Sequence, residues 1–64
     1  MKEYHCRCSK RTKKWMPIVA QSAQKAAEIY AEECRLEYPD IVTIMDGREF
    51  RIYQEILYHA KEQP

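Results

Sequence analysis

Five side chains of this sequence are potential zinc ligands: His5, Cys6, Cys8, Cys34 and His59. Three thiolates and one imidazole would complete the tetrahedral shell of a structural site. The spacing disfavours such a site, because these sites usually use Cys-x2-Cys on a tight turn, whereas Cys-x-Cys on an extended strand holds its sulfur atoms about 6–7 Å apart. Buried cysteine is common in protein cores. We therefore predict that the cysteines pack in the core and that the protein binds no metal or other cofactor.

The same residues offer little for catalysis. Cys6 and Cys8 are too close on an extended strand to bridge each other, and three cysteines cannot form a complete disulfide framework, so reduced thiols and a cytoplasmic location are expected. Cys34 is expected near the C-terminus of a helix, where the negative end of the helix dipole disfavours a thiolate. The sequence offers neither a glycine-rich phosphate loop nor a recognisable Ser-His-Asp arrangement. We predict that the protein is not an enzyme.

A basic segment is the feature most typical of nucleic-acid binding. It consists of Lys10, Arg11, Lys13 and Lys14, followed directly by Trp15. Cations neutralise phosphates, and an indole ring can stack on a base. A solvated hairpin tip that protects a sheet edge has the same composition. Nucleic-acid binding through residues 10–15 is therefore the alternative function.

Charge is separated along the chain. Residues 1–16 carry six basic side chains and one acidic side chain, a net charge of +5, whereas the remainder carries five basic and nine acidic side chains, a net charge of −4. The separation suits the orientation of one partner or self-association, and it disfavours the wrapping of nucleic acid. No apolar run approaches the roughly 20 residues of a membrane helix, and the basic N-terminus lacks the apolar stretch of a signal peptide. We expect no membrane association.

The length of 64 residues predicts a single domain, residues 1–64, with a small core. Residues 3–9 alternate in polarity, which predicts a strand with Tyr4, Cys6 and Cys8 on its buried face. Residues 14–21 favour a second strand, which Pro17 restricts to a sheet edge because proline has no N–H to donate. Residues 10–13 would connect the two strands as a hairpin.

A helix is predicted over about residues 22–37. Ser22 is a strong N-cap, and the segment that follows is rich in helix formers. Small and aromatic residues fall on one stripe, which would let the helix lie close to a sheet: Ala23, Ala26, Ala27, Tyr30 and Cys34. Pro39 is expected to end the helix.

Asp46-Gly47 predicts a hairpin between residues 40–45 and 48–53. A three-residue loop is favoured over a two-residue loop, because it places Val42, Ile44, Phe50 and Ile52 on one face. Residues 54–64 fit a strand or a helix, and an extended continuation is favoured. The predicted fold class is α+β with ββαββ order, a four-stranded antiparallel sheet and one helix packed on one face.

The other face of such a sheet is expected to bind a protein. It would carry His5, Arg7, Trp15, Val19, Arg51, Tyr53 and Leu57. Aromatic and arginine side chains are enriched in interface cores. The predicted partner-binding residues are Trp15, Tyr53, Arg7, Arg51, Lys10, Arg11, Lys13 and Lys14. The partner would be another protein or, in a homodimer, a second copy of this chain.

The stretch from Pro17 to Glu33, with its strand, serine cap and Ala-Ala helix, followed by the Asp46-Gly47 hairpin, resembles very small phage-encoded accessory proteins. Some compact anti-CRISPR proteins are similar in length and share the ββαββ layout. The resemblance implies a stoichiometric inhibitor or modulator of a host complex, acting in the host cytoplasm. On a nucleic-acid machine, the basic segment would occupy an acidic surface, or Glu28, Glu32, Glu33 and Glu37 would mimic phosphates.

Overall fold

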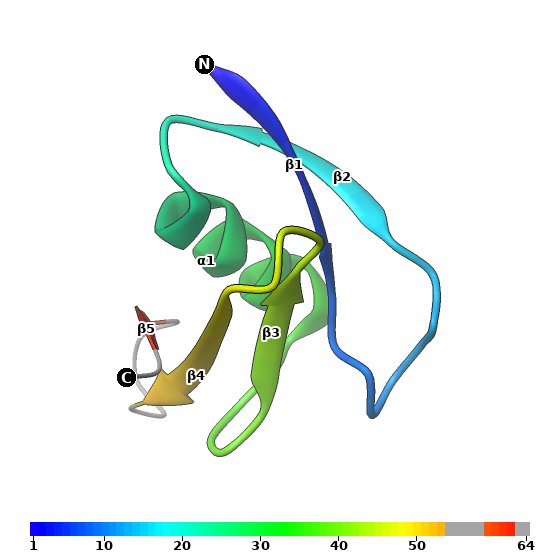
Figure 1. The fold of residues 1–64 in the computed structure, drawn as a ribbon. Coiled ribbons are helices and arrows are strands. Elements are labelled where there is room, and N and C mark those ends of the chain that lie inside the picture. The colour runs from blue at the N-terminus through cyan, green and yellow to red at the C-terminus, as the bar shows by residue number, and fades with distance from the viewer. Residues whose placement is uncertain (54–58, 63–64) are drawn as a thin grey trace.

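The computed structural model describes residues 1–53 and 59–62, which form one helix and five strands. In chain order these are β1 (Lys2–Arg7), β2 (Met16–Ala20), α1 (Ala23–Cys34), β3 (Ile41–Ile44), β4 (Glu49–Tyr53) and β5 (His59–Glu62). The strands pair antiparallel in one sheet of order β2-β1-β3-β4-β5, and α1 packs against all of them (Figure 1). The predicted ββαββ layout is confirmed, and β5 extends the sheet beyond β4.

The core lies between α1 and one face of the sheet. Alanines on α1 are fully buried, which brings the helix backbone close to the strands. Tyr4 and Cys34 pack partly buried against the same cluster. The core side chains are Cys6, Cys8, Ile18, Ala20, Ala23, Ala26, Ala27, Tyr30, Ala31, Leu36, Val42, Ile44, Phe50 and Ile52.

The ends of α1 have clear physical causes. The Ser22 hydroxyl accepts a hydrogen bond from the Lys25 N–H at 3.2 Å, as expected of an N-cap. At the other end Arg35 adopts a left-handed conformation, with φ of 55°, and its N–H bonds back to the last turn. The helix therefore ends at Cys34, before the predicted residue 37, and Pro39 is not needed to stop it.

The β3–β4 hairpin has the predicted register. Val42 pairs with Phe50, and the Ile44 N–H donates to the Arg48 carbonyl at 2.8 Å across a three-residue loop. Gly47 has φ of +103°, a conformation that side chains rarely adopt. Both strands consequently direct their apolar side chains toward α1.

Strand β2 forms one edge of the sheet, as Pro17 predicts. The His5 carbonyl accepts a hydrogen bond from the Met45 N–H at 2.8 Å, so His5 directs its backbone polar groups toward β3 and away from β2. Pro17 lies opposite His5 in the register. Its missing N–H therefore removes no bond from the β1–β2 ladder.

Strand β5 pairs antiparallel with β4. Strand is thus confirmed over helix for residues 59–62, but as a returning strand and not as a continuation of β4. Residues 54–58 and 63–64, including Leu57 on the predicted open face, lie outside the described residues. No helix within the described ranges is long and apolar enough to cross a bilayer.

Candidate functional site

The face of the sheet opposite α1, called the open face below, carries side chains that alternate with the core residues along each strand. Its described members are mostly exposed or half-buried: Glu3, His5, Arg7, Pro17, Val19, Ile41, Thr43, Glu49, Arg51 and Tyr53. Val19 is 60% exposed, although it is an aliphatic residue in the middle of a strand. Of the residues predicted for this face, His5, Arg7, Val19, Arg51 and Tyr53 lie on it.

Arg7 and Trp15 form one unit at the end of the open face. The Arg7 guanidinium carbon lies 4.2 Å from the centroid of the Trp15 ring, a cation–π contact. Arg7 also donates from Nη1 to the Lys13 carbonyl at 3.0 Å, while its buried Nε has no hydrogen-bond partner within the described part of the chain. The stack holds Trp15 half-buried and covers one face of the indole, which limits the stacking of a base on it.

The predicted basic segment divides into two parts. Lys10 Nζ lies 3.8 Å and Arg11 Nη2 lies 3.5 Å from the carboxylate of Asp40, which is 8% exposed and also accepts the Glu37 N–H at 3.2 Å. Lys13 and Lys14 are exposed, and neither side chain makes an ion pair within residues 1–53. Two of the four cations are therefore used internally, to neutralise a buried carboxylate.

Tyr53 lies at the opposite end of the open face from Val19. Its ring centroid is 6.1 Å from that of Tyr38, with the two planes tilted by 37°. Tyr38 belongs to the segment between α1 and β3, so the pair joins two parts of the chain at the surface. Arg51 precedes Tyr53 on β4 and is half-buried opposite Ile41 on β3.

The cysteines belong to the core and its margin. Cys6 and Cys8 are buried, and Cys34 is partly buried. Burial raises the pKa of the Cys6 thiol to about 11, so this thiol stays protonated at neutral pH and is a poor nucleophile or metal ligand. No group of three potential metal ligands occurs among the residues that the structure describes, a set that excludes the His59 side chain.

Tyr30 connects α1 to the end of β1. Its hydroxyl accepts a hydrogen bond from the Cys8 N–H at 3.1 Å, while the ring is 1% exposed. Burial raises the pKa of Tyr30, the Cys8 hydrogen bond opposes that rise, and the neighbouring Cys34 thiol adds to it. The bond satisfies a buried backbone donor just beyond the end of β1.

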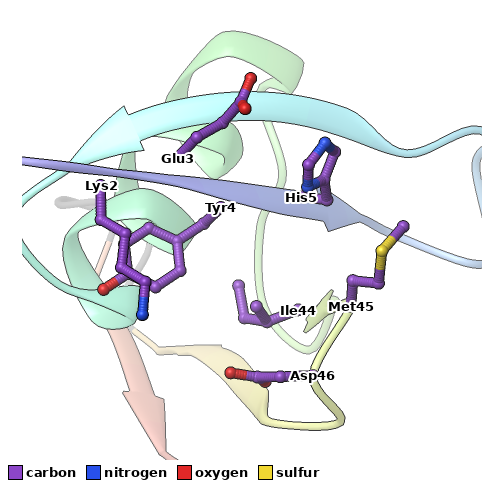
Figure 2. A pocket seen from close by; sticks show the side chains of 7 residues that line it. All are labelled: Lys2, Glu3, Tyr4, His5, Ile44, Met45 and Asp46. Carbon is purple, nitrogen blue, oxygen red and sulfur yellow. The ribbon is translucent and has the colours of Figure 1, made fainter.

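A pocket of about 300 Å³ lies between the first half of β1 and the β3–β4 hairpin (Figure 2). Residues 2–5 line it from β1, and residues 44–46 line it from the hairpin. Lys2 and Tyr4 project from one side of β1 and Glu3 and His5 from the other, because side chains alternate along a strand. Hydrogen bonds from Arg48 lower the pKa of Asp46; those from the Arg48 side chain contribute most, and the one from its backbone N–H contributes less. His5 lies above the β1 ribbon in Figure 2 and Asp46 below it, and the Asp46 carboxylate is bonded to Arg48.

The fold and the site define a small α+β domain with a one-sided helix layer and an open, mixed aromatic and arginine sheet face. No protein-family model, curated protein or solved structure is significantly similar to the chain. Sequence reasoning missed the roles of Asp40 and Tyr30. One signal in the sequence could have indicated the role of Asp40: it directly precedes the apolar strand residues Ile41 and Val42, and a carboxylate drawn into a core needs a cationic partner.

Proposed function

We propose that this protein is a non-enzymatic protein-binding module that docks through its open face. The supporting observation is that α1 covers one face of the sheet, while the other combines an Arg7–Trp15 stack with the exposed Val19 and Tyr53. Tryptophan, tyrosine and arginine are the residues that most often dominate binding energy in interfaces. An inhibitor or modulator of a host complex, encoded by a phage or another mobile element, is the role that fits this module and the resemblance described above.

The internal use of Lys10 and Arg11 favours a protein partner over nucleic acid. Lys10 and Arg11 are exposed but already face the Asp40 carboxylate, whereas Lys13 and Lys14 make no ion pair among residues 1–53. These two lysines would neutralise about two phosphates, which gives a weak salt dependence of binding. The same two lysines suit a few acidic side chains at the margin of a protein partner. A gel-shift titration at low and moderate salt tests the alternative: tight, steeply salt-dependent binding would favour nucleic acid.

Affinity capture from a bacterial lysate tests the proposal. Wild type is compared with Trp15→Ala and Tyr53→Ala on the open face and with Ile29→Ala on the helix. Ile29 is a matched control, because it is 38% exposed and Tyr53 is 37% exposed. We expect one protein to be retained by wild type and by Ile29→Ala and to be lost from both open-face variants. Equal recovery with all four proteins would contradict docking through this face.

A further inference from the structure

The outer edge of β2 offers free backbone hydrogen-bonding groups. Pro17 lies opposite His5 and directs its carbonyl outward, away from β1. The direction of the backbone polar groups repeats every second residue along a strand. Val19, two residues further and opposite Glu3, therefore also directs its N–H and C=O outward. No other strand of the described residues pairs with this edge, since β2 is the terminal strand of the sheet. Such an edge pairs readily with another strand unless charge or shape prevents it.

The sequence of this edge carries no charge. Ten consecutive residues, 15–24, contain no Lys, Arg, Asp or Glu in a chain that is 33% charged. Charged side chains on edge strands are a common protection against pairing, and here that protection is absent from the whole strand. Pro17 is the remaining protective feature, and its effect depends on the register of the incoming strand.

We propose that two copies of this chain form a dimer in which their β2 strands pair antiparallel about a twofold axis at Val19. In this register the two Val19 residues exchange both backbone hydrogen bonds, and each Pro17 carbonyl faces Gln21 of the other copy. A twofold at Pro17 would instead place two residues without N–H groups opposite each other, which removes the central pair of bonds. Pro17 therefore selects one register and does not block pairing.

A second copy is the occupant that suits an uncharged edge. The incoming strand must itself be a sheet edge without charge, and residues 15–24 of another copy meet that requirement. Antiparallel pairing sets the start of one β2 beside the end of the other, where α1 begins without an acidic side chain in its first turn. The exposed Lys13 and Lys14 therefore lie at the two ends of the pair, outside its uncharged centre, and the same surface of each copy faces the other, as a twofold interface requires.

The oligomeric state tests the proposal. Sedimentation equilibrium over a wide range of concentrations is expected to give twice the 7.7 kDa mass of one chain for wild type. Val19→Lys, which sets two cations against each other at the axis, is expected to give the monomer mass. Met45→Lys, the same change of an exposed apolar residue that β1 separates from β2, should remain dimeric, as should Tyr53→Ala. Circular dichroism checks that each variant is folded. We expect the lysine variants to fold, because Val19 and Met45 are exposed.

The register has its own readout. Paired Val19 residues have Cα atoms about 5.5 Å apart, within the range that a disulfide bridges. Val19→Cys treated with oxidised glutathione is expected to form a covalent dimer, with two thiols oxidised and two glutathione molecules released, whereas Met45→Cys stays monomeric on a non-reducing gel. A monomeric wild type, or loss of the dimer in Tyr53→Ala with retention in Val19→Lys, would overturn the proposal. Neither result depends on whether the open face binds another protein.

Discussion

Replacing Tyr30 with phenylalanine measures what one buried hydroxyl contributes to stability, chiefly as the acceptor for the Cys8 N–H. The ring of Tyr30 stays in place among the core side chains, but the Cys8 N–H, 3.1 Å from the hydroxyl in wild type, loses its acceptor. A buried donor left without a partner costs about 1–3 kcal/mol. Truncation to alanine would add a cavity and cost about 3–5 kcal/mol, so the phenylalanine variant is the cleaner probe.

Urea unfolding followed by Trp15 fluorescence measures the change in the free energy of unfolding. With a urea m-value of about 1–3 kcal/mol/M for a small protein, a loss of about 2 kcal/mol lowers the urea midpoint by about 0.7–2 M, well above the error of the measurement. Tyr38→Phe is the matched control, because Tyr38 is 58% exposed and its hydroxyl can bond to water. We expect that control to lie within about 0.5 kcal/mol of wild type. A Tyr30→Phe variant as stable as Tyr38→Phe would refute the assigned role of the hydroxyl.

Two further predictions concern the core thiol and the hairpin. The Cys6 thiol ionises near its ordinary pKa of 9.0 in the unfolded chain but near 11 in the folded protein, so its contribution to stability is complete below pH 9 and is lost as the pH rises through 11. Thermal unfolding should show a smaller alkaline loss for Cys6→Ala than for wild type, and parallel pH profiles would contradict this cause. Gly47→Ala should cost about 1–2 kcal/mol in urea unfolding, from backbone strain alone, because φ is +103° and no atom lies within 4 Å of the new Cβ. A neutral substitution would show that the loop relaxes.

The parts of the fold that were predictable depend on residues that are close to each other in the sequence. Polarity alternates along residues 41–44 and 49–52, so one register alone buries Val42, Ile44, Phe50 and Ile52 together, and Gly47 supplies the conformation that this register needs. Ser22 marks the start of α1 because its side chain reaches the N–H three residues on. Pro17 places β2 at an edge because it lacks a donor.

The partners of the site residues were decided by tertiary structure. Lys10 and Arg11 meet Asp40, about thirty positions later in the chain, and Tyr30 meets Cys8 from the far end of α1. Composition marks such side chains as charged or aromatic, but the folded path of the chain alone determines which of them become neighbours. The sequence by itself therefore determined the elements, their faces and the edge position of β2. Packing between distant segments decided which cations pair with a carboxylate and which aromatic rings remain at the surface, because those contacts follow from through-space distance and not from spacing along the chain.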